Sequence, residues 1–128
     1  MNSGVHIFAL LAAVLHVFIF LMESLWFMRP NVYSRFGAKS LAEAETNRLF
    51  AFNQGFYNLF LAVAIFGGLG LAHFDGNLVV AHTLILSSGA TMLGAAVVLF
   101  LSAGKKMLRA ACIQGVFPML AWISWLTF

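Results

Sequence analysis

The sequence contains very little charge. Only 9% of its 128 residues are Asp, Glu, Lys or Arg, whereas a typical soluble domain carries about 25%. Four apolar stretches fill most of the chain, roughly residues 4–27, 48–71, 78–101 and 107–127. Each has the length of about 20 residues that a helix needs to cross a hydrocarbon core of about 30 Å. A soluble bundle is disfavoured, because its helices would carry polar stripes that face water.

Strand patterns, disulfides and a cleavable leader are also missing. No segment shows the alternation typical of strands, and backbone inside a membrane must satisfy its own hydrogen bonds, so an all-α fold is predicted. We expect one integral membrane four-helix bundle over residues 1–128. The single Cys112 excludes an internal disulfide, and the spacing of Cys and His suggests no metal site. A signal peptide is disfavoured, because the first stretch lacks a basic start and ends in "ESLWFMRP".

Positive charge is confined to two of the three loops between the apolar stretches. All seven Lys and Arg residues lie in or beside the first and third loops, and the second loop, "HFDGN", has none. The positive-inside rule therefore places loops one and three in the cytoplasm and both termini on the other side. We expect the excess positive charge to meet anionic lipid head groups, and we expect no nucleic-acid partner.

The first loop carries signals for two helix boundaries. Pro30 is expected to end the first helix, because it lacks a backbone N–H and restricts the residue before it. In "SLAEAETNRLF", Ser40 and Glu43 have the spacing of a capping box. The second helix is therefore predicted to begin near residue 41, before the chain enters the membrane.

The segment "FNQGFYN", residues 52–58, places three amides and a tyrosine at the head of the second apolar stretch. On a helix, Asn53 and Tyr57 are neighbours four residues apart, and so are Gln54 and Asn58. The spacing predicts a polar stripe about two turns tall near the cytoplasmic boundary. These side chains need partners, because bare amides are costly in lipid.

Polar residues of the other helices are expected at a similar depth. Glu23 lies near the cytoplasmic end of the first helix, and Arg48 precedes the amides. Gln114 lies in the fourth helix, and Lys105 lies below it in the third loop. An ionisable residue inside a membrane segment is by default a functional-site hypothesis. We therefore predict a polar pocket open to the cytoplasm.

The residues of this pocket divide into two predicted roles. Glu23 and Tyr57 are the candidate catalytic residues. The candidate ligand-binding residues are Arg48, Asn53, Gln54, Asn58, Lys105 and Gln114. The two cations favour an anionic group, and the amides orient it by hydrogen bonds.

Other interpretations of these residues stay open. The same side chains can simply join helices through hydrogen bonds of about 0.6 kcal/mol each, and Glu23 can pair with Arg48. A lone carboxylate in a short four-helix chain is also compatible with a small proton-coupled transporter. A structural or accessory role is a further alternative. His16 is mid-membrane, seven residues before Glu23 and on the same face of the first helix. Haem ligation by His16 is disfavoured.

The other histidines lie toward the opposite ends of the helices. His6 and His73 are expected at the non-cytoplasmic face, and His82 just inside it. No function is predicted for these three residues.

Several motifs resemble those of a known family. "MESLWF", "NQGFYNLFLA" and "IQGVFPMLAWI" resemble domain-of-unknown-function family 1304, small four-helix membrane proteins of bacteria, over nearly the whole chain. The resemblance implies a multi-pass protein of the bacterial cytoplasmic (inner) membrane. It implies little about function.

A looser resemblance is to the MAPEG superfamily, the membrane proteins of eicosanoid and glutathione metabolism. It rests on "ETNRLFAFNQGFY", in which Arg48, Asn53 and Tyr57 follow the order of the superfamily's second helix. The resemblance implies a homotrimer that binds glutathione or another anionic small molecule between subunits, together with a lipophilic small molecule. The pattern departs from the superfamily in two places. Five residues rather than four separate Arg48 from Asn53, and Phe56 stands where an acid is expected.

The MAPEG resemblance also implies roles for the two candidate catalytic residues. Tyr57 would donate a hydrogen bond to a thiolate or an oxyanion. Glu23 would act as a proton acceptor. Whether the chain is an enzyme is left open, because no nucleophile–base pair, phosphate loop or metal signature is recognisable.

Overall fold

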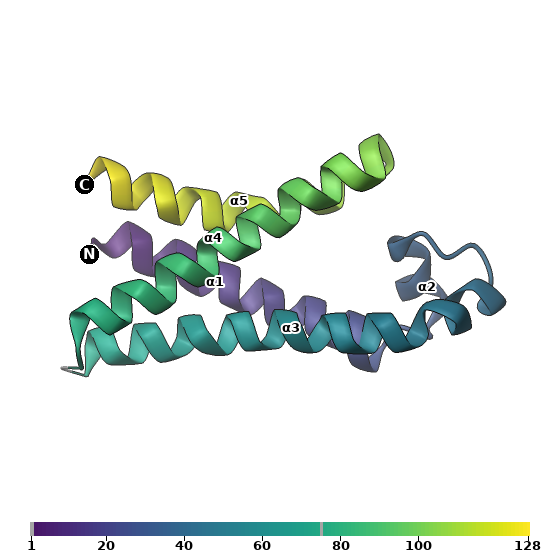
Figure 1. Ribbon diagram of the computed structural model, residues 1–128, viewed down its shortest axis with the longest axis horizontal. Helices are drawn as coiled ribbons and strands as arrows, with labels where there is room; N and C mark the ends of the chain where they lie inside the picture. Colours follow the sequence, from purple (N-terminus) through teal and green to yellow (C-terminus); the bar gives the residue numbers. More distant parts are fainter. Residues whose placement is uncertain (1, 75) are drawn as a thin grey trace. The chain divides into compact units, whose positions relative to one another are not determined.

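The computed structural model describes residues 2–74 and 76–128, and this part of the chain is all-α and about 90% helical. The predicted all-α class is therefore confirmed, whereas the four-helix membrane bundle stays a prediction. The main helices are α1 (Ser3–Phe20), α2 (Pro30–Tyr33), α3 (Leu41–His73), α4 (Leu78–Ala103) and α5 (Leu108–Thr127) (Figure 1). Three short turns of other helical type join them: a π-helical turn at Leu21–Leu25 and 3₁₀ turns at Ser34–Phe36 and Gly104–Met107.

Three helical stretches of the described chain are long and apolar enough to cross a membrane. They are Ser3–Leu25, Leu41–His73 and Leu78–Thr127. The third holds both α4 and α5, which are joined by the 3₁₀ turn at Gly104–Met107. The protein is thus a multi-pass membrane protein by length and composition. The expected number of four crossings and their orientation stay predictions.

The first loop confirms one predicted helix boundary and corrects the other. Ser40 Oγ accepts a hydrogen bond from the backbone N–H of Glu43, and the Glu43 carboxylate accepts one from the backbone N–H of Lys39. This reciprocal capping begins α3 at Leu41, as predicted. Pro30 does not end the first helix, which stops at Leu25. Pro30 instead begins α2, a position where its missing N–H costs nothing.

The chain forms two compact units, which are described separately. The terminal unit consists of the chain up to Leu15 together with Leu61–Phe128, and the loop unit consists of His16–Phe60. Helices α1 and α3 each contribute residues to both units. The expectation of a single domain stays a prediction.

In the terminal unit, α4 and α5 form a hairpin. Gly104 adopts a φ of 72°, which favours glycine, and the chain reverses there so that α5 returns along α4 (Figure 1). The Trp122 indole N–H donates a hydrogen bond of 3.1 Å to the carbonyl of Leu86. A Cβ on Gly115 would lie only 3.1 Å from the Cβ of Ala96. The two backbones therefore approach closely, as small residues allow in membrane helices.

Gly68 sets the distance between α3 and α4 in the terminal unit. A Cβ there would lie 2.8 Å from Cγ1 of Ile85 and 2.9 Å from the carbonyl oxygen of Ala81. Overpacking of this kind costs about 1–3 kcal/mol. We expect Gly68→Ala to lower the free energy of unfolding in mixed detergent micelles by about 1–2 kcal/mol.

Gly67 is the matched control for this substitution, because a Cβ on Gly67 would meet no described atom outside its own stretch of helix within 4 Å. Gly67→Ala should leave the free energy of unfolding unchanged or slightly raised, since Ala is the better helix former. Equal losses in the two variants would contradict the close approach at Gly68.

In the loop unit, the first loop folds back on a small apolar core. Phe27, Ala38 and Ala44 are buried in this core. The half-buried side chains packed around them are Met28, Tyr33, Phe36 and Ala51. The Arg29 guanidinium lies 5.0 Å from the centre of the Trp26 ring, a cation–π distance. The loop unit thus gives a fixed frame to the end of the first membrane stretch.

Candidate functional site

The π-helical turn places Glu23 against α3 in the loop unit. Its wider spacing is visible in the backbone, where the N–H of Trp26 donates to the carbonyl of Leu21, five residues earlier, at 2.8 Å. Glu23 is only 9% exposed. Turns of this type are rare and frequently occur at functional sites. The turn therefore marks Glu23 as a residue held inward at a definite place.

Asn58 is the hydrogen-bond partner of Glu23. Its side-chain amide donates to the Glu23 carboxylate at 2.6 Å and lies 3.2 Å from the carbonyl oxygen of Gln54, one turn earlier in α3. A hydrogen bond to a carboxylate is stronger than one between neutral groups. One predicted ligand-binding residue is thus joined directly to one predicted catalytic residue.

Ser24 and Gly55 bring the two helical segments into close contact. The Ser24 hydroxyl donates a hydrogen bond of 2.7 Å to the carbonyl of Phe52. A Cβ on Gly55 would overlap Ser24 Oγ and would lie 3.1 Å from the Ser24 backbone nitrogen. A side chain at this position would press on the hydroxyl and backbone of Ser24, so Gly55 in "NQGFYN" allows the close contact.

A cavity of about 170 Å³ lies beside this contact within the loop unit. Its polar lining comes from Glu23, Ser24 and Arg48. The apolar lining is Leu25, Phe27, Met28 and Phe52. In the described chain no salt bridge joins Glu23 to Arg48, so the carboxylate and the guanidinium face the same cavity without neutralising each other directly. Such a cavity can accept a small polar group that offers both a donor and an acceptor.

The other polar side chains of the predicted stripe make no described hydrogen bond to Glu23. Tyr57 is 63% exposed. Asn53 is also exposed, and its amide donates to the Leu49 carbonyl of its own helix at 2.9 Å. The side chain of Gln54 is exposed as well. Of these polar side chains, in the described chain only that of Asn58 donates a hydrogen bond to Glu23.

Two predicted ligand-binding residues belong to the terminal unit. Lys105 lies in the 3₁₀ turn between α4 and α5, and Gln114 lies in α5. Their participation in a common pocket stays a prediction. His16, in the loop unit, is 2% exposed and so is buried like Glu23. Among the described residues, no group of three or more His, Cys, Asp and Glu side chains is placed to hold a metal ion.

The sequence interpretation missed several residues of this site. Ser24, Phe27, Met28 and Gly55 were not singled out, although all four contact or line the region around Glu23. The glycine within "NQGFYN" was the available signal. A glycine between bulky neighbours in a helix often marks a close approach by another segment.

Comparison with known proteins identifies the sequence family. Residues 10–126 match the family described as "Protein of unknown function (DUF1304)". No curated protein and no solved structure matches the chain significantly. The match covers most of the chain, including every residue of the loop unit.

Proposed function

We propose that this chain, which belongs to the DUF1304 family of proteins of unknown function, is a membrane protein that binds the polar group of a small amphiphile beside Glu23. The observation that carries the proposal is the cavity lined by Glu23, Ser24 and Arg48. A carboxylate and a guanidinium that share a cavity without a salt bridge are both available to a third group. A ligand with an anionic oxygen and a hydrogen-bond donor can bond to both groups at once, beside the buried Glu23.

The cavity's size and lining define the class of ligand. Its volume of about 170 Å³ is smaller than the roughly 300–1,000 Å³ of sites that enclose whole drug-sized molecules. It therefore accommodates a head group, while the apolar remainder of the ligand lies along exposed membrane-facing side chains such as Phe52, Leu49 and Phe50. Arg48 favours an anionic oxygen group such as a carboxylate. Glu23 then accepts a hydrogen bond, or a proton, from a donor on the same ligand.

The exposed polar face of α3 supports an oligomeric form of this proposal. Asn53 and Tyr57 are exposed in the single chain, and polar side chains on membrane helices favour contact with a neighbouring helix. We propose a homotrimer, as the MAPEG resemblance implies, with both termini non-cytoplasmic and loops one and three in the cytoplasm of a bacterial inner membrane. In this arrangement Tyr57 of one subunit faces a ligand or residue of the next.

Native mass spectrometry of the full chain, released from mild detergent, tests the binding proposal. We expect a retained small-molecule adduct in the wild type and at least a ten-fold lower adduct occupancy in Arg48→Met, because hydrogen bonds to charged groups contribute about 1.5–3 kcal/mol. Arg35→Met is the matched control. Arg35 is an exposed arginine of the same unit and does not line the cavity.

Two outcomes of this experiment would count against the proposal. An adduct that survives Arg48→Met as well as Arg35→Met places the ligand elsewhere. If the wild-type protein retains no adduct and binds none of the added fatty-acid probes, the proposed binding function is wrong. The oligomeric state read from the same spectra tests the trimer independently.

A further inference from the structure

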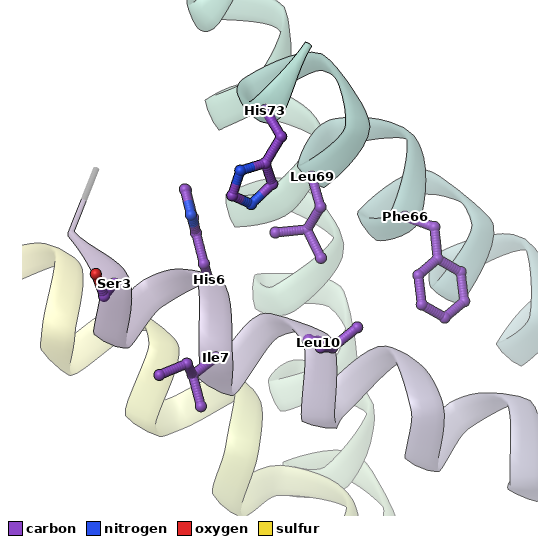
Figure 2. A pocket seen from close by; sticks show the side chains of 7 residues that line it. All are labelled: Ser3, His6, Ile7, Leu10, Phe66, Leu69 and His73. Atoms are coloured by element: carbon purple, nitrogen blue, oxygen red, sulfur yellow. The ribbon is translucent and has the colours of Figure 1, made fainter.

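A second cavity lies in the terminal unit, between the first half of α1 and the last part of α3. Its volume is about 450 Å³, within the roughly 300–1,000 Å³ range of small-molecule sites. Figure 2 shows the His6 side chain rising from α1 toward His73, whose ring projects from the end of α3. This cavity shares no residue with the one beside Glu23.

The two histidines form the polar end of this cavity. Their ring centres are 5.1 Å apart, with the planes at 67°, so one ring meets the other edge-on. Nε2 of His6 is buried and has no hydrogen-bond partner in the described chain. Buried polar atoms of folded proteins nearly always have a partner. An unpaired imidazole nitrogen in a cavity wall therefore indicates a place where a ligand's polar atom can be received.

Apart from Ser3, the rest of the lining is apolar. Ile7 and Leu10 contribute from α1, and Phe66 and Leu69 contribute from α3 (Figure 2). No Lys, Arg, Asp or Glu of the described chain lines the cavity. An apolar wall with a few polar groups at one end is the usual construction of a small-molecule site. It suits an uncharged ligand, because an ionic group would find no fixed counter-charge there.

We propose that this cavity binds a neutral ring compound with one hydrogen-bonding oxygen, of the phenol or quinone class. The oxygen meets Nε2 of His6 beside the His73 ring, and the ring system lies against Phe66, Leu69 and Leu10. A neutral imidazole can donate through one nitrogen and accept through the other, so it serves a hydroxyl or a carbonyl equally well. This site is independent of the proposed function, and either can fail without the other.

Nuclear magnetic resonance of the full chain with ¹⁵N-labelled histidine, in micelles, tests this site with 1-naphthol as the probe. We expect the His6 ring nitrogen signals to shift and saturate on addition of 1-naphthol. Naphthalene has the same ring system without the oxygen, and it should shift Nε2 of His6 far less. Saturation-transfer measurements should give a dissociation constant for 1-naphthol about ten-fold higher in His6→Phe, the scale of one lost hydrogen bond.

His82→Phe is the matched control variant. The His82 ring packs on Trp125 at 5.3 Å and does not line this cavity, so its dissociation constant for 1-naphthol should equal that of the wild type. Equal shifts of His6 Nε2 with naphthol and naphthalene would overturn the proposal. A response of both rings to Zn²⁺ but not to naphthol would also overturn it, in favour of a metal site. The wild-type spectra decide the matter even if His6→Phe fails to fold.

Discussion

Asn58→Leu is expected to lower the free energy of unfolding by about 2–3 kcal/mol, as measured in mixed detergent micelles. The substitution removes the amide that donates to the Glu23 carboxylate at 2.6 Å. Glu23 is 9% exposed, so water replaces the amide poorly. A buried carboxyl group that loses its hydrogen-bond donor costs more than the bond itself contributes.

Gln54→Leu is the control for this loss. Gln54 is an exposed amide of the same helix, one turn before Asn58, and it makes no described side-chain hydrogen bond to Glu23. Its replacement should change the free energy of unfolding by no more than about 0.5 kcal/mol, as usual for surface positions. A loss in Gln54→Leu as large as in Asn58→Leu would show that the amide–carboxylate bond is not the cause.

The double variant separates the bond from general packing. Replacing both members of a buried polar pair by apolar side chains can be nearly neutral. We therefore expect Glu23→Leu combined with Asn58→Leu to recover most of the stability that Asn58→Leu loses. Losses that simply add in the double variant would contradict a direct coupling between the two residues.

Gly55→Ala is expected to cost a similar amount, about 2–3 kcal/mol, by separating the two helical segments. Its Cβ would overlap Ser24 Oγ. Rotating that hydroxyl away breaks its hydrogen bond to the carbonyl of Phe52, and the Ser24 backbone nitrogen at 3.1 Å still restricts the space. The same unfolding measurement reports the loss.

Gly70→Ala is the matched control, because in the described chain no atom outside its own stretch of helix α3 lies within 4 Å of a Cβ on Gly70. It should leave stability unchanged or slightly raised. Ser24→Ala combined with Gly55→Ala should recover part of the loss, since it removes the nearest obstructing atom. No recovery in that variant would count against the close contact between Ser24 and Gly55.

The helical architecture could be predicted because it depends on local and one-dimensional signals. The scarcity of charge locates the apolar stretches, and the Ser40–Glu43 spacing gives the start of α3. The π-helical turn at Leu21–Leu25 could not be predicted in this way. Its extra residue depends on how Glu23 packs against α3, which is a tertiary effect that overrides the local preference for an α-helix.

The candidate site could be predicted only in part, for a geometric reason. Helical periodicity says that Asn53 and Tyr57 are neighbours, but it does not say toward which helix they point. The structure turns Asn58 toward Glu23 and leaves Tyr57 63% exposed. Lys105 and Gln114 were grouped with these residues by depth in the membrane alone. Depth does not give lateral position. The grouping of Lys105 and Gln114 with Glu23 therefore has less support than the pairing of Glu23 with Asn58.

The π-helical turn has a consequence for comparing relatives of this protein. A helix widened by one residue at Leu21–Leu25 is equivalent, in genetic terms, to an α-helix that has gained a single codon. Losing one residue there would restore the ordinary turn and rotate the next residues of the chain by roughly 100°, the angle of one residue in a helix of 3.6 residues per turn. Relatives without an inward carboxylate at this place should therefore align best with a gap of one residue before the tryptophan at the end of the turn.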